Sequence, residues 1–158
     1  MTPTPIGPPL SDAERTALAS RWNEHPAMKH MGVRLDLSAP DVVRVYVDPV
    51  QAYHRGGLGT DAVNGVVIAG AFDLTIGLVG HFCAIGRRTG TVQLNIHFVR
   101  PVHGDRFDVL GRLVRAGRSL VFATADLHDE SGQLCARCDG IVALVGEPVA
   151  GAEERIAL

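Results

Sequence analysis

The chain has 158 residues, 46% of them hydrophobic and 20% charged, so it is long and apolar enough to bury the core of one domain. Its 15 Lys and Arg residues against 17 Asp and Glu residues leave a net charge of −2, which excludes the basic surface that nucleic acid or an anionic membrane requires. Aromatic residues make up only 5%, and this also disfavours stacking on nucleobases.

Residues 1–10 contain four prolines and no basic residue, so they lack the charged start and apolar run of a secretory signal. We expect them to form a flexible N-terminal arm. The regular patterns extend over residues 11–146, which predicts a single domain, and residues 147–158 are expected to form a C-terminal tail.

The first predicted helix begins at Ser11, because Ser11 and Glu14 have the S-x-x-E spacing of a capping box. Leu18 and Trp22 are four residues apart and share one face of that helix, which we expect to end within residues 23–26. Two segments then alternate apolar and polar side chains around a turn at residues 39–41. This pattern predicts a β-hairpin with strands over residues 33–37 and 43–47.

A glycine-rich segment, residues 53–61, follows the hairpin. It lacks both common glycine motifs for phosphate binding, so we interpret it as a loop that passes close to other backbone. Residues 64–82 then predict a long helix that is apolar nearly all round. It is long enough to cross a membrane, but Asp73 at mid-span is costly in lipid. We therefore interpret it as a buried core helix and predict a soluble, cytoplasmic protein that does not bind membranes.

Period-two alternation continues to the end of the domain and predicts four strands, over residues 89–101, 106–116, 119–128 and 133–145. In the first of them, Val92, Leu94, Ile96 and Phe98 are expected to share one face. A helix without a polar face, in a chain of antiparallel strands, must be covered by the sheet. The predicted class is α+β, with a long central helix wrapped by a curved antiparallel sheet of about six strands.

Cysteines and histidines give no sign of a metal site. Cys135 and Cys138 match C-x-x-C, but they lie in a predicted strand, where positions three apart face opposite sides. None of the seven histidines has zinc-type spacing. We therefore predict reduced thiols, no metal and no cofactor.

Two features of the long helix could carry chemistry. Asp73 is its single charge, and two interpretations stay open: a carboxylate paired with an arginine or solvent, or one kept for acid–base or nucleophilic work. Asn64 is a strong N-cap, and Gly65 beside it leaves the first backbone amides open to a ligand oxygen. Asp73 lies about 13–14 Å further along the same helix than Asn64. A site that uses both ends therefore requires two antiparallel helices from two subunits.

Four segments in this order resemble the hotdog-fold acyl-CoA thioesterases of the PaaI-like (4-hydroxybenzoyl-CoA thioesterase-like) type. That family has a His-Gly-Gly sequence at the start of the central helix with an Asp on it, an Asn-Phe-x-Arg-Pro strand end, an Arg-x-Gly-Arg hairpin and a later Asp-x-x-Gly. The resemblance covers about residues 27 to 146. The corresponding segments here are Asn64–Asp73, Val92–Pro101, Val114–Ser119 and Asp129–Ala136.

The resemblance implies the hotdog fold, a homodimer whose sheets join, a pairing of such dimers, and hydrolysis of an acyl-CoA with an aromatic or short to medium-length acyl group. Coenzyme A would be part of the substrate and not a cofactor. By position, Asp73 matches the family's catalytic carboxylate, and Gly65 matches the glycine whose amide polarises the thioester carbonyl. Asn64, Val66 and Leu58 replace the family's His, second Gly and water-orienting Asn. The resemblance places Arg100, Arg115, Arg118 and Ser119 where substrate is bound.

Two other functions remain as alternatives. A hotdog domain that binds acyl-CoA or another apolar acid without catalysis is compatible with the changes at Asn64, Val66 and Leu58. A hotdog hydratase or dehydratase needs a histidine with a carboxylate in the site. It is disfavoured because the helix has no histidine before His81.

Overall fold

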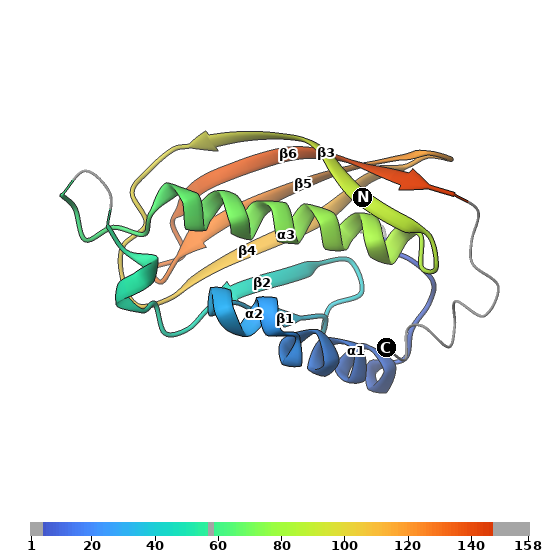
Figure 1. Cartoon of the computed structure of the whole chain (residues 1–158), viewed down its shortest axis with the longest axis horizontal. Helices are drawn as coiled ribbons and strands as arrows, with labels where there is room; N and C mark the ends of the chain where they lie inside the picture. The colour runs from blue at the N-terminus through green and yellow to red at the C-terminus, as the bar shows by residue number, and fades with distance from the viewer. Residues whose placement is uncertain (1–4, 57–58, 147–158) are drawn as a thin grey trace.

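The computed structural model of the chain describes residues 5–56 and 59–146. Six strands form one antiparallel sheet in the order β1-β2-β4-β5-β6-β3, and the long helix α3 lies along one face of it (Figure 1). This confirms the predicted α+β architecture of a curved six-stranded sheet around a central helix. The helices are α1 (Asp12–Glu24), α2 (Pro26–Met31), the 3-10 turn η1 (Ala52–His54) and α3 (Gly65–Cys83); the strands are β1 (Arg34–Asp36), β2 (Val43–Val47), β3 (Arg88–Phe98), β4 (Phe107–Ala116), β5 (Leu120–Asp129) and β6 (Leu134–Val145).

The first helix forms where its capping pattern predicts. The Glu14 amide donates to the Ser11 hydroxyl (3.3 Å), and the Ser11 amide donates to the Glu14 carboxylate (2.7 Å). These bonds satisfy helix-end donors that would otherwise be unpaired. After α1, the amide side chain of Asn23 pairs with both backbone groups of Leu35, which attaches the helix to edge strand β1. The short helix α2, which begins at Pro26, was not predicted.

Glycines in the sheet let α3 approach closely. A Cβ at Gly111 of β4 would lie 2.5 Å from Cγ2 of Thr75, and one at Gly140 of β6 would lie 2.5 Å from Cγ2 of Ile76. Real Cβ atoms do not approach so closely, so any side chain at either position would push the helix away from the sheet. These two glycines thus determine how deeply α3 sits in the curve of the sheet.

Two of the three bulges in the described sheet change predicted side-chain placements. Val92 lies at a register shift between Thr91 and Gln93 and is 61% exposed, so the prediction that it shares the inner face with Leu94 and Ile96 is wrong. The inner face is restored at Leu94 and Ile96, which pack against the core.

The second bulge lies in β6 at Cys135, opposite Leu127 and His128. Because a bulge reverses the alternation, Cys135 and Cys138 are both buried, and the prediction that they face opposite sides is wrong. Burial raises the pKa of the Cys138 thiol to about 11. A thiol with so high a pKa is almost wholly protonated near neutral pH, so it is a poor nucleophile.

Helix α3 is long and apolar enough to cross a membrane by length and composition, with a mean hydropathy of 1.8, yet half of that stretch is buried within the fold. One such helix is weak evidence of a membrane span, because the core helix of a soluble domain has the same properties. Its packing on five strands of the sheet agrees with the core-helix interpretation.

The ends of the predicted domain lie partly outside the described residues, which exclude 1–4 and 147–158. Within the predicted N-terminal arm, the Ile6 amide donates to the Pro40 carbonyl (2.9 Å). Ile6 and Leu10 also pack against the core. The division of the chain into arm, domain and tail stays a prediction.

Candidate active site

The amino end of α3 offers an open backbone amide. The Asn64 side chain accepts from the Val66 amide (2.8 Å), and the Asn64 amide donates to the His54 carbonyl (2.8 Å). The Gly65 amide has no acceptor among residues 5–56 and 59–146, and Gly65 is exposed. Asn64 therefore works as the predicted N-cap, and the next amide stays free to bind a carbonyl oxygen.

The aromatic ring of Phe98 forms a wall beside this amide. Phe98 ends edge strand β3 and is 58% exposed. A Cβ at Gly65 would lie 3.7 Å from Cε1 of the ring, an ordinary contact. Val66, in the first turn of α3, is 80% exposed at the same end. The sequence indicated Val66 as a site residue but missed Phe98, whose only local sign is its place just before Arg100 and Pro101.

Asp73 is not buried in the single chain. It lies on an exposed or half-buried stripe of α3 that also includes Val66, Gly70 and Gly77. The interpretation of α3 as a buried helix is therefore wrong for this stripe. A carboxylate at this position can reach solvent or a partner molecule without breaking the core.

Asp73 and Gly65 are eight residues apart on one helix, so they are separated by about 12 Å along its axis. A thioester carbonyl in contact with the Gly65 amide cannot also reach the Asp73 carboxylate of the same chain. A site that uses both groups requires a second copy of α3.

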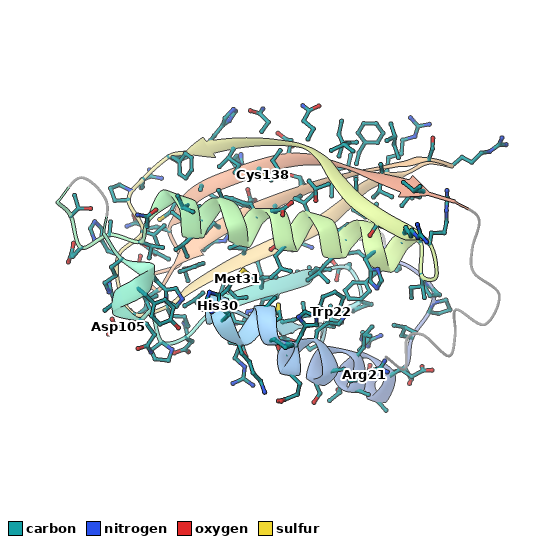
Figure 2. All side chains as sticks on the ribbon, in the orientation of Figure 1. Arg21, Trp22, His30, Met31, Asp105 and Cys138 are labelled. Carbon is teal, nitrogen blue, oxygen red and sulfur yellow. The ribbon has the colours of Figure 1, made fainter. Side chains whose placement is uncertain are left out.

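A groove of about 240 Å³ begins at Asp73 and follows α3 toward its carboxyl end. His81, eight residues after Asp73, lies near its far end. The ring of Trp22 meets His81 edge to face with ring centroids 5.7 Å apart, and Trp22 lies on the side of α1 that faces the rest of the fold (Figure 2). Burial lowers the pKa of His81, so the imidazole is neutral near pH 7 and adds no charge to the wall. The full lining is Trp22, Asp73, Leu74, Gly77, Leu78, His81, Thr89, Gly90 and Thr91.

The three arginines predicted to bind substrate do not form one patch in a single chain. Arg100 donates to the Leu134 carbonyl (2.9 Å), close to the sheet end where α3 begins. Arg115 and Arg118 are exposed at the β4–β5 hairpin, near the end of α3 (Figure 1). Arg115 pairs with Phe122 of β5, which in turn pairs with Ile141 of β6. Ile141 is seven residues from Leu134 along β6, so Arg115 and Arg100 contact the sheet at levels about 23 Å apart.

Ser119 and Leu58 are the remaining residues predicted to bind substrate. Ser119 is exposed at the same hairpin, and its carbonyl accepts from the Leu144 amide (2.8 Å). Leu58 lies outside the described residues. Within residues 5–56 and 59–146, no three His, Cys, Asp or Glu side chains are placed to hold a metal ion.

Asn64, Gly65 and Asp73 lie in a segment that matches a known protein family. Residues 61–136 match the model of the family described as "Thioesterase superfamily". The protein named medium/long-chain acyl-CoA thioesterase YigI from Escherichia coli K12 is 32% identical over 89 residues, which cover 48% of this chain and 57% of that protein. The chain thus spans a little more than half the length of the relatives it matches.

Solved structures share the fold over nearly the whole chain. The thioesterase HI1161 from Haemophilus influenzae superposes with a TM-score of 0.76 at 17% identity, covering 90% of this chain and 96% of that one. The PaaI protein from Escherichia coli superposes with a TM-score of 0.72 at 15% identity, covering 87% and 97%. The chain therefore has the hotdog fold that the sequence motifs predicted, and its segment 61–136 is similar to the thioesterase superfamily.

Proposed function

We propose that the protein is an acyl-CoA thioesterase that hydrolyses its substrate between two subunits of a homodimer. The observation that carries this proposal is the open Gly65 amide and the exposed Asp73 carboxylate on one helix, within the segment that matches the thioesterase superfamily. An amide donor and a carboxylate are the two groups that hydrolysis of a thioester needs. The E. coli relative named as an acyl-CoA thioesterase supports the same substrate class.

In this mechanism Gly65 of one subunit and Asp73 of the other act on the same thioester. The Gly65 amide donates to the carbonyl oxygen and stabilises the negative charge that develops there. Asp73 either attacks the carbonyl carbon, giving an anhydride that water then cleaves, or removes a proton from the attacking water. Both routes consume one water and release the free acid and the thiol of coenzyme A.

The dimer is expected to form at β3. This strand is one edge of the sheet and spans 11 residues, whereas the opposite edge strand β1 spans three and is partly capped by Asn23. A long, uncovered edge strand favours pairing with another strand. The exposed apolar side chains Val92, Phe98 and Val99 lie on or just after β3. The family resemblance further suggests that two such dimers associate.

A two-fold dimer would also bring the arginines together. Antiparallel pairing of two β3 strands places opposite ends of the two sheets side by side. Arg100 of one subunit would then lie at the same end of the dimer as Arg115, Arg118 and Ser119 of the other. We place the phosphates of coenzyme A there, and the pantetheine arm beside Val66 on its way to the thioester.

The groove at Asp73 would hold the acyl group. Leu74, Leu78 and Trp22 provide apolar surface, and the rings of Trp22 and His81 lie together at the end away from the carboxylate. A groove of this volume fits an aromatic ring or a short to medium acyl chain better than a long one.

Replacing Trp22 with Ala is expected to shift the preference toward longer acyl chains, because it removes a large ring from the end of the groove. The ratio of kcat/KM for a long over a short acyl-CoA should rise about tenfold. Gly77→Ala should have the opposite effect. Its Cβ would lie 3.5 Å from Oγ1 of Thr91, so the variant fits the fold but narrows the groove. The ratio of kcat/KM for a long over a short acyl-CoA should therefore fall. Steady-state kinetics on an acyl-CoA length series measure both. Unchanged ratios in both variants would show that the acyl group binds elsewhere.

A hotdog domain that binds acyl-CoA without hydrolysis is the second candidate. It is favoured by one observation: the Asn64 side chain, which stands where the family has His, accepts a hydrogen bond from the Val66 amide. One lone pair of Asn64 is therefore already used in capping the helix.

Release of free thiol from a panel of acyl-CoAs, measured beside binding of the same panel, decides between the two candidates. We expect turnover with acyl-CoA, and a higher KM for the same acyl groups on N-acetylcysteamine, which lacks the phosphates. That difference in KM should shrink as salt rises, because salt screens the arginines. Saturable binding of acyl-CoA without thiol release would instead establish the binding domain.

We also place the protein in the cytoplasm. The cysteines Cys83, Cys135 and Cys138 are all free thiols. Unpaired cysteines are typical of proteins in a reducing compartment.

A further inference from the structure

A buried histidine lies directly behind the amino end of α3. His54 ends the turn η1 and is 1% exposed, although it takes no part in the chemistry proposed above. A buried imidazole is stable only when both of its ring nitrogens have hydrogen-bond partners. The partners of His54 therefore show what the residue does.

Both ring nitrogens bind backbone groups from different segments. Nδ1 accepts from the Gln51 amide (2.9 Å), and Nε2 lies 2.8 Å from the carbonyl of Met31, the last residue of α2. A carbonyl can only accept, so Nε2 must donate, and the ring is the neutral Nε2–H tautomer. The ring therefore joins η1 to the end of α2.

The backbone of the same residue holds the start of α3. The His54 carbonyl accepts from the Asn64 amide (2.8 Å), and Asn64 in turn caps the helix through Val66 and Ile68. The ring is tightly enclosed: at Gly32, whose φ is +64°, a Cβ would lie 2.8 Å from Nε2. His54 thus links the end of α2, the turn η1 and the N-cap of α3.

We propose that His54 is a positioning residue that holds the Gly65 amide where the thioester carbonyl binds. It acts through its carbonyl on Asn64, and its ring keeps that carbonyl in place. This inference rests on the proposed function for its catalytic consequence, because the amide it positions is the one assigned to the oxyanion. The hydrogen-bonded link from α2 through His54 to Asn64, which we call the tether, can be tested without any substrate.

Three substitutions separate the two ring bonds. His54→Phe keeps the shape of the ring but removes both bonds, His54→Asn can keep an acceptor toward Gln51, and His54→Gln can keep a donor toward Met31. Because the bond to Met31 is the one that reaches another segment, His54→Gln should retain the most function. Val121→Ala is the matched control: Val121 is fully buried and pairs with Ala116 and Val142, at the opposite end of the sheet from the start of α3.

The kinetic test compares kcat of these variants per folded active site, at a temperature well below the melting temperature of each. We expect kcat for acyl-CoA to fall about tenfold or more in His54→Phe and His54→Asn, with KM nearly unchanged, because the oxyanion contact acts in the transition state. His54→Gln should stay within a few-fold of wild type, and Val121→Ala should lose stability but not kcat. If His54 had a purely structural role, Val121→Ala would lower kcat as much as the His54 variants do at the same loss of melting temperature, or no variant would lower kcat. Either result would overturn the proposal.

Amide hydrogen exchange tests the tether independently of activity. The amides of Asn64, Val66 and Ile68 should exchange faster in His54→Phe, while the amides in the second half of α3 keep their wild-type rates. Unchanged exchange at these three amides would overturn the inference even if kcat fell. If instead the wild type hydrolyses no thioester but exchange changes as expected, the tether stands and the proposed function fails.

Discussion

Asp73→Asn is expected to leave the protein folded and to lower kcat for acyl-CoA by about 10²-fold or more, the scale of a lost acid–base group or nucleophile. The amide keeps the size of the carboxylate but can neither accept a proton from water nor attack the thioester. Because Asp73 is exposed in the single chain, its replacement opens no cavity and should barely change the melting temperature. Thiol release under saturating substrate measures the effect.

The matched control is Asp139→Asn, the same chemical change at an exposed position of β6, away from α3. It should keep wild-type turnover. An Asp73→Asn protein that retains activity within a few-fold of wild type would remove Asp73 from the mechanism.

Gly65→Pro is expected to lower kcat by about 10²- to 10³-fold, because it deletes the single N–H that is assigned to the oxyanion. Proline is well tolerated at the first position of a helix, where its missing N–H is not part of the helical ladder. The preceding residue, Asn64, already has the extended backbone that a following proline requires, with φ −64° and ψ 138°. The variant should therefore fold with a normal circular dichroism spectrum.

The two inactive variants should complement each other if the site is shared between subunits. In a heterodimer of Gly65→Pro with Asp73→Asn, one site carries both defects and the other carries neither. Random pairing on co-expression should then restore about a quarter of wild-type activity. Light scattering should show the active species at twice the chain mass of 16.8 kDa or more. A mixture no better than its parents, or an active monomer, would place the whole site in one chain.

Local signals in the sequence predicted most of the elements. The capping box at Ser11, the N-cap at Asn64 and the alternation in the last four strands depend on neighbours within a few residues. The structure confirms each of these within one to three residues. The order of the predicted elements also indicated the sheet that covers α3, since an apolar helix among antiparallel strands has few other ways to bury its surface.

The sequence by itself determined the helix, the strands and the placement of Asp73 and Gly65 on one helix, because caps and periodicity are local. Only the tertiary structure decided which side chains reach the surface and which meet. Strand pairing creates the bulges that expose Val92 and bury Cys135, and α3 leaves the stripe with Asp73 uncovered. Contacts such as Phe98 beside Gly65, and Trp22 against His81, join segments far apart in the chain, so no local pattern encodes them.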